Sequence, residues 1–187
     1  MSEVEQWSRF KAAAYSFFNR NPKSNRLIVE LAGLTPQDRT LDIGCGPGAA
    51  VREASRLVTE AVGVDPSPSM VEIAQKRSSE FPNVSFEVGS AEDLPFADGA
   101  FTVAWTVSAF HHWADEDAGL VEASRVLAQG GRLLIMERAG SGKHALSDGG
   151  AEELASDLER VGFVDAEVSH HKKEVVVAAA VPSEASS

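Results

Sequence analysis

Three alternating glycines follow a short apolar segment that contains an acid. The segment reads LDIGCGPG over residues 41–48, and the next apolar segment ends in a second acid, Asp65. Glycine tolerates positive φ angles and lets a ligand approach the backbone closely. An acid that ends the strand after a glycine-rich turn can accept hydrogen bonds from the two hydroxyls of a ribose. The spacing therefore predicts a site for a nucleoside-type cofactor.

Apolar strands and helices alternate from residue 36 onward, which predicts a mostly parallel sheet with helices on both faces. Strands are expected at Leu41–Ile43, Ala61–Val64, Val84–Val88, Phe101–Val107, Leu133–Glu137, Ala166–Ser169 and Val175–Val181. Helices are expected at Gln6–Asn19, Ser24–Leu34, Ala49–Val58, Pro68–Glu80, Asp115–Ala128 and Ala151–Val161. The short link 170–173 predicts that the last two strands form an antiparallel hairpin.

Composition indicates a single domain over residues 1–187, with a helical cap at 1–35, a core at 36–181 and a tail at 182–187. The apolar content is 43%, enough for a sizeable core. No apolar run is long enough for a membrane span, and the first residues are unlike a signal peptide. The lone Cys45 excludes an internal disulfide and fits a reducing, cytoplasmic location. The net charge of -11 disfavours a nucleic-acid partner.

Three segments with polar or glycine residues follow the first three strands of the expected sheet. They are the glycine loop 44–48, Asp65 and the segment 90–96. Ligands of such sheets bind beyond the carboxyl ends of the strands, at the point where the strand order reverses. We therefore expect these three segments to converge on one site.

Five motifs occur in a fixed order between Thr40 and Glu137: LDIGCGPG, VGVDPSPSMVEIA, GSAEDLPFADGAF, SAFHHW and SRVLAQGGRLLIMER. With them the chain resembles class I S-adenosylmethionine-dependent methyltransferases. The resemblance is to the small-molecule group related to ubiquinone/menaquinone C-methyltransferases, with a methyltransferase type 11 domain. It implies a Rossmann-like α/β fold with seven strands in the order 3-2-1-4-5-7-6. It also implies S-adenosylmethionine as the cofactor and S-adenosylhomocysteine as the product.

The resemblance assigns the methionine and ribose parts of the cofactor to residues near the first two strands and the fourth. The glycine loop would wrap the methionine part with Gly44, Cys45, Gly46 and Gly48. Asp42 would lie near the amino group of the cofactor, and Asp65 would accept hydrogen bonds from the ribose hydroxyls. Thr106 would offer its backbone carbonyl to the methionine ammonium.

The resemblance assigns the adenine to Pro66, Met70, Ser90, Ala91, Glu92 and Leu94. The backbone N–H of Ala91 would read the edge of the adenine. Ser90 stands where members of the family often have an aspartate, so Glu92 or Asp93 could take over the bond to the adenine amino group. Thr102 also replaces a frequent aspartate, at a position that is usually structural.

Two adjacent histidines, His111 and His112, follow the fourth strand and are the candidates for a catalytic base, of which His111 is preferred. An imidazole that titrates near neutrality suits the removal of a proton from an acceptor hydroxyl. The alternative is that one of them only satisfies a backbone carbonyl. No metal ligands are expected. Trp113 and Trp105 are expected to pack in the core, and His144 is expected to be exposed in a loop at the rim of the site. Tyr15, on the first helix, is a candidate for ligand contact.

A short, glycine-rich segment at residues 138–150 stands where relatives commonly insert a helical lid that recognises the acceptor. The site could be open, it could be closed by a second subunit in a homodimer, or it could order when the substrate binds. The predicted function is methyl transfer to a small or lipid-like metabolite. The alternative is a catalytically silent S-adenosylmethionine-binding or regulatory protein. A dinucleotide is disfavoured because the loop lacks the G-x-G-x-x-G spacing, and RNA methylation is disfavoured by the charge.

Overall fold

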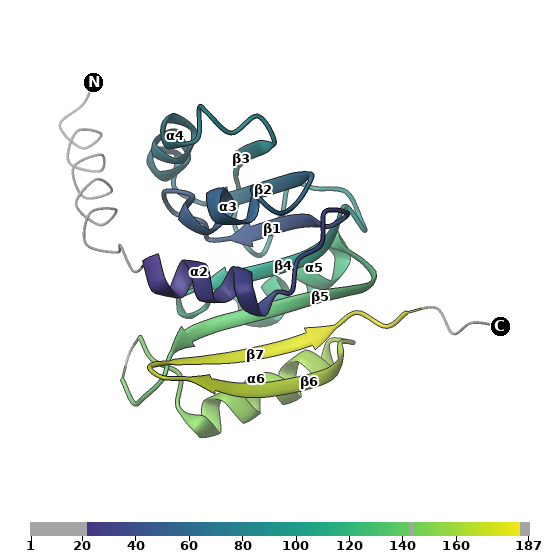
Figure 1. Cartoon of the computed structure of the whole chain (residues 1–187). Coiled ribbons are helices and arrows are strands. Elements are labelled where there is room, and N and C mark those ends of the chain that lie inside the picture. The colour runs from purple at the N-terminus through teal and green to yellow at the C-terminus, as the bar shows by residue number, and fades with distance from the viewer. Residues whose placement is uncertain (1–21, 143, 184–187) are drawn as a thin grey trace.

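A seven-stranded sheet forms the centre of the computed structural model, which describes residues 22–142 and 144–183 (Figure 1). Its strands are β1 (Arg39–Ile43), β2 (Glu60–Asp65), β3 (Val84–Val88), β4 (Phe101–Val107), β5 (Leu127–Arg138), β6 (Val164–His171) and β7 (Glu174–Ala180). The order is β3-β2-β1-β4-β5-β7-β6. Strands β1 to β5 pair in parallel, whereas β7 is antiparallel to both β5 and β6. The predicted strand order and the C-terminal hairpin are confirmed.

Helices cover both faces of this sheet, as predicted. They are α2 (Pro22–Leu31), α3 (Ala49–Ala54), α4 (Pro68–Arg77), α5 (Glu116–Val126), α6 (Asp148–Arg160) and the short 3-10 helix η1 (Phe110–His112). Buried residues of α5 and α6 join one core cluster, and those of α2, α3 and α4 join a second one. Figure 1 shows α2 and α3 in front of the sheet and α5 and α6 behind it. None of the helices in the described residues has the length and apolarity that crossing a bilayer requires.

The central strands are buried on both faces, which holds the loops at their carboxyl ends in place. Along β4, Val103 and Trp105 pack into the α2–α4 side of the core, while Ala104 packs into the α5–α6 side. This alternation is the period-two pattern of a strand. Each fully buried large apolar side chain contributes about 1.5–3 kcal/mol. The sheet is therefore a rigid platform for the site.

Several predicted boundaries differ from the structure for identifiable reasons. The helix expected to reach Ala128 ends at Val126, because β5 begins at Leu127, which pairs with Phe101. The register then shifts between Phe101 and Val103, which marks a bulge across residues 128–131. Helix α6 starts at Asp148 rather than at Ala151, because the Ser147 hydroxyl accepts a hydrogen bond from a backbone N–H of its first turn. Helix α3 ends at Ala54, earlier than expected.

The start of α4 agrees with its sequence signals. Ser67 caps the helix by accepting a hydrogen bond from the Met70 N–H at 3.4 Å, and Pro68 occupies the first helical position. This cap fixes the turn that follows β2. The expected helix Gln6–Asn19, with Tyr15, lies outside the described residues, as do the last four residues of the expected tail.

Candidate active site

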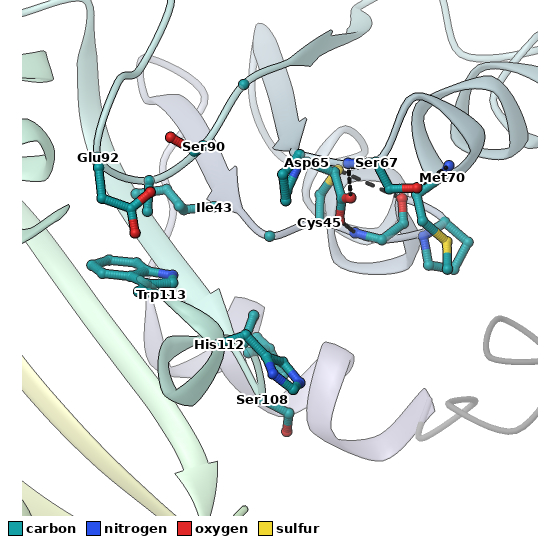
Figure 2. Close-up of a pocket in the computed structure, with 18 of the residues that line it drawn as sticks. Ile43, Cys45, Asp65, Ser67, Met70, Ser90, Glu92, Ser108, His112 and Trp113 are labelled. Carbon is teal, nitrogen blue, oxygen red and sulfur yellow. Dashed lines mark hydrogen bonds between the residues drawn. The ribbon is translucent and has the colours of Figure 1, made fainter. Parts of the chain in front are cut away.

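A cavity of about 480 Å³ opens at the carboxyl ends of β1, β2, β3 and β4 (Figure 2). Its wall comes from Asn25 of α2 and from four loop segments, which are residues 43–47 with 49, residues 65–67 with 70, residues 89–92, and residues 107–109 with 112–114. The three segments singled out in the sequence therefore converge, as predicted. Figure 2 shows Asp65, Ser67 and Met70 on one side of the cavity and Glu92 and Trp113 on the other.

The three glycines of the loop after β1 share a positive φ angle but differ in what surrounds them. All have positive φ: Gly44 at 77°, Gly46 at 49° and Gly48 at 73°. A Cβ at Gly44 would lie 2.6 Å from the Cβ of Ala109, so this glycine lets the loops after β1 and β4 touch. A Cβ at Gly48 would lie 2.6 Å from the Phe86 ring, whereas one at Gly46 would meet no atom of the described residues within 4 Å. Gly44 and Gly46 line the cavity together with Cys45, and Gly48 instead packs behind it.

The Asp65 carboxylate is held in a fixed orientation on the cavity wall. Its Oδ2 accepts the Gly46 N–H at 2.8 Å and its Oδ1 accepts the Ser67 N–H at 2.9 Å (Figure 2). Burial raises the pKa of Asp65, and these two backbone hydrogen bonds oppose the rise. A carboxylate oxygen has two lone pairs, so each keeps one acceptor position. The pair of free positions fits two neighbouring hydroxyls of a ribose.

Asp42 lies beneath the glycine loop rather than on the cavity wall, with an exposed fraction of only 3%. Burial raises the pKa of Asp42 to about 7, the Trp105 indole opposes this rise, and the charge of Asp65 adds to it. Burial also raises the pKa of the Cys45 thiol, and the two aspartates raise it further. Cys45 is therefore a protonated, unreactive thiol.

The loop after β3 brings Ser90, Ala91 and Glu92 to the cavity, where they join Pro66 of the loop after β2 and Met70 of the first turn of α4. Glu92 Oε1 accepts the N–H of Ala114 at 2.6 Å, which ties the loop after β3 to the loop after η1. Hydrogen bonds to its carboxylate outweigh burial and lower the pKa of Glu92. Glu92 is therefore anionic, and one of its oxygens is already engaged.

Two residues assigned to the cofactor lie behind the wall of the cavity. Leu94 is buried, its N–H donates to Glu122 Oε2 at 2.9 Å, and its carbonyl accepts from Arg125. Thr106 is fully buried, and its hydroxyl oxygen has no hydrogen-bond partner within residues 22–142 and 144–183. Their roles at the cofactor remain predictions, as do the roles of the other assigned residues.

The two candidate bases occupy different positions in η1. His112 lines the cavity, whereas His111 does not. Nδ1 of His111 lies 2.9 Å from Oε2 of Glu137, and Oε1 of Glu137 accepts the Phe110 N–H at 2.9 Å. Burial raises the pKa of Glu137, and the contact with His111 opposes the rise. The sequence-based preference for His111 as the base gains no support from this geometry, because His112 is the histidine that faces the cavity.

Other wall residues were not found from the sequence. Trp113 packs against the core, as expected, with its ring 4.9 Å from that of Phe110, but it also lies on the cavity wall. Asn25 and Ser108 also line the cavity, and Ser108 has a φ of 51°. Neither residue type signals such a position. Trp105 is fully buried, as expected.

Comparison of the sequence with known protein families identifies the family of the chain. The sequence profile described as "Methyltransferase domain" matches residues 41–135 of the chain. The chain belongs to the class I S-adenosylmethionine-dependent methyltransferases. The matched range begins in β1 and ends in β5, so it includes the glycine loop, Asp65 and η1.

Three relatives illustrate the similarity. The chain is 35% identical over 137 residues to "Uncharacterized methyltransferase YcgJ" of Bacillus subtilis, covering 72% of this chain and 52% of that protein. It is 34% identical to a demethylmenaquinone methyltransferase of Tropheryma whipplei (60% and 46% covered). It is 38% identical to a 27-O-demethylrifamycin SV methyltransferase of Amycolatopsis mediterranei (60% and 44% covered). The chain thus spans about half the length of these relatives.

The crystal structure of YcgJ shares the fold. It superposes with a TM-score of 0.73 at 20% identity, covering 86% of this chain and 98% of that one. At this level of identity the likeness concerns the fold and not the reaction.

Proposed function

We propose that this protein transfers a methyl group from S-adenosylmethionine to a small or lipid-like metabolite. The observation that carries the proposal is the Asp65 carboxylate at the end of β2. It is oriented by the N–H groups of Gly46 and Ser67, and it keeps acceptor positions toward the cavity. The cavity volume of about 480 Å³ is within the range of small-molecule sites.

Different residues of the cavity would bind the cofactor and assist the reaction. When bound, S-adenosylmethionine supplies a methyl group on a positively charged sulfur, which a nucleophile takes by in-line displacement. Asp65 would hold the ribose, the glycine loop would hold the methionine part, and Pro66 and Met70 would pack on the adenine. His112, on the wall near Trp113, would accept the proton of an acceptor that arrives protonated.

A second cavity gives room for the acceptor. It has a volume of about 310 Å³ and shares Asn25, Val107 and Ser108 with the first one. Its wall carries two cations, Arg138 and Lys173, and one anion, Glu174, which accepts the Ser24 hydroxyl at 2.7 Å. The excess of positive charge favours an acceptor with an electron-rich or anionic group. Two relatives carry names that specify a demethylmenaquinone and a 27-O-demethylrifamycin SV as acceptors, which supports an acceptor of metabolite type.

Calorimetric titration of the full chain with S-adenosylmethionine, S-adenosylhomocysteine and NAD tests the cofactor. We expect binding of the first two and no binding of NAD. The variant Asp65→Asn keeps the shape of the side chain but loses its charge, and we expect it to weaken binding by about 2–4 kcal/mol. Binding of NAD would contradict the choice of S-adenosylmethionine as the cofactor, and unchanged affinity in the variant would refute the ribose assignment of Asp65.

Turnover needs a separate readout. Formation of S-adenosylhomocysteine is followed by mass spectrometry during incubation with a set of hydroxyl, enol and amine metabolites. We expect an acceptor-dependent increase above the background of the cofactor alone. Binding of the cofactor without turnover on any acceptor of the set would favour the silent, regulatory alternative and contradict the proposed reaction.

A further inference from the structure

Three imidazoles gather beside the cavity although they come from two separate segments. His111 and His112 belong to η1, and His144 belongs to the loop between β5 and α6. The ring centroids are 4.0 Å apart for His111 and His112, 4.9 Å for His111 and His144, and 5.7 Å for His112 and His144. One nitrogen of each ring lies within 4.8 Å of the corresponding nitrogens of the other two.

The carboxylate of Glu137 supports this cluster from within the core. Glu137 is 2% exposed and sits near the end of β5. Its Oε2 contacts Nδ1 of His111, which leaves Nε2 on the opposite edge of the ring. A histidine that binds a metal typically turns its other nitrogen toward such a carboxylate, which fixes the ring and raises its basicity. The arrangement of Glu137 and His111 therefore matches that of a metal ligand with its supporting acid.

We propose that His111, His112 and His144 bind a divalent transition-metal ion of the zinc type at the edge of the cavity. Imidazole nitrogens prefer Zn²⁺ and its neighbours to Mg²⁺ or Ca²⁺. Three nitrogens about 2.0–2.1 Å from a tetrahedral ion lie about 3.3 Å from one another. The observed limit of 4.8 Å is therefore wider than in a loaded site by about 1.5 Å. His144 is exposed on a loop that contains Gly140 and Gly142, so that loop can close the difference.

Three protein ligands leave a fourth position for a bound molecule, as in catalytic zinc sites. Because His112 also lines the cavity, this fourth position lies at the cavity edge. The next step rests on the proposed function: the acceptors of this site are compounds with a hydroxyl or enol group. With the ion bound, His112 is a ligand and no longer the base, and a hydroxyl held by the ion releases its proton to water more readily than a free hydroxyl does. Its oxygen then forms a bond to the methyl carbon while the bond from that carbon to sulfur breaks, and the sulfur keeps the electron pair.

Metal binding is tested on the full chain after treatment with a chelator. Co²⁺ is added as a spectroscopic probe, because its visible absorption reports nitrogen ligation, and Zn²⁺ affinity is measured by calorimetry. We expect one ion per chain. His144→Ala should weaken Zn²⁺ binding at least about tenfold, the scale seen for losses at metal sites. His144 lies on an exposed loop, so this variant tests the site without removing a core contact.

The matched control is the double variant His170→Ala, His171→Ala, which removes two histidines of the β6–β7 hairpin outside the cluster. We expect it to bind Zn²⁺ as the unmodified chain does. No Zn²⁺ binding, equal affinity after His144→Ala, or a loss confined to the double variant would each overturn the metal site. S-adenosylmethionine is titrated into the same metal-free proteins. Its failure to bind would contradict the proposed function, while the Zn²⁺ result would still decide the metal site.

Discussion

Asp42 should make this protein less stable as the pH rises from weakly acidic to neutral. Burial raises the pKa of this carboxyl from 3.8 in a model compound to about 7, with the Trp105 indole opposing and Asp65 adding to the rise. Between these pH values the folded protein keeps a proton that the unfolded chain releases. Stability therefore falls with rising pH, at about 1.4 kcal/mol per pH unit, to a total of about 4 kcal/mol.

Replacing Asp42 by Asn removes the titration and keeps a side chain of the same shape. The free energy of unfolding is measured by urea denaturation, followed by circular dichroism, at several values from about pH 5 to about pH 8. We expect the variant to gain about 3 kcal/mol relative to the unmodified chain across this range, since part of the total is already lost below pH 5. If the difference in free energy of unfolding between the variant and the unmodified chain does not vary with pH, the raised pKa of Asp42 is refuted.

Asp38→Asn is the matched control because the pKa of Asp38 is shifted in the opposite direction. Burial alone would raise it, but the Thr102 hydroxyl and hydrogen bonds from Thr35 outweigh burial and lower the pKa of Asp38. A carboxyl with a lowered pKa contributes stability that is lost only as the pH falls toward its folded value. Above about pH 5 Asp38 is charged in both states, so its variant should show a difference that is constant with pH.

Two further substitutions test how the site is built. Gly48→Ala places a Cβ 2.6 Å from the Phe86 ring at a φ of 73°, and we expect a loss of about 2–4 kcal/mol in urea denaturation. Gly149→Ala, where a Cβ meets none of the residues that the structure describes within 4 Å, should instead be neutral or stabilising, and equal losses would contradict the packing argument. Arg125→Met removes the side-chain donor to the Phe96 carbonyl at 2.7 Å and one of the two donors to the Leu94 carbonyl, which still accepts the Phe96 N–H. We expect a cost of about 1–3 kcal/mol of stability and weaker cofactor binding in calorimetry. Unchanged values of both would show that these contacts do not order the loop after β3.

The strand order was implied by the resemblance to a known family, whereas the convergence of the loops could be predicted from signals at the ends of the individual strands. The glycine spacing at residues 44–48 follows β1, and the acid Asp65 ends β2, the next strand along the chain. The parallel sheet then brings them to the same edge. The cap formed by Ser67 and Pro68 is likewise a signal of adjacent residues. Such features need no knowledge of contacts between distant segments.

The features that the sequence did not reveal depend on contacts across the sheet. In the sequence, Glu137 is the polar end of a strand. In the structure it is buried, and its carboxylate contacts His111, which lies after the neighbouring strand β4. The sequence predicts that His144 is an exposed loop residue, and it is exposed. Only the fold, however, brings its ring close to the ring of His111 in η1. The 3-10 conformation of residues 110–112 decides which histidine faces the cavity. A motif of two adjacent histidines carries no information on that choice.

The raised pKa of Asp42 has a consequence for binding as well as for stability. S-adenosylmethionine carries an ammonium and a sulfonium, and a cation near a buried carboxyl lowers its pKa. If the cofactor lies near Asp42, its binding at pH values below about 7 must therefore release a proton. Affinity should rise with pH, by as much as about tenfold per pH unit between about pH 5 and pH 7, and then level off. Asp42→Asn should abolish this rise.

Calorimetry in two buffers with different enthalpies of ionisation measures the released proton directly. At about pH 6 we expect the apparent binding enthalpy of the unmodified chain to depend on the buffer, and that of Asp42→Asn to be independent of it. Equal buffer dependence in both proteins would assign the proton to another group, such as Asp65, whose pKa burial also raises. In either case, burial destabilises the charged form of the carboxyl in the free protein. The positive charge of the bound cofactor offsets this effect, so the carboxyl strengthens binding once it is ionised.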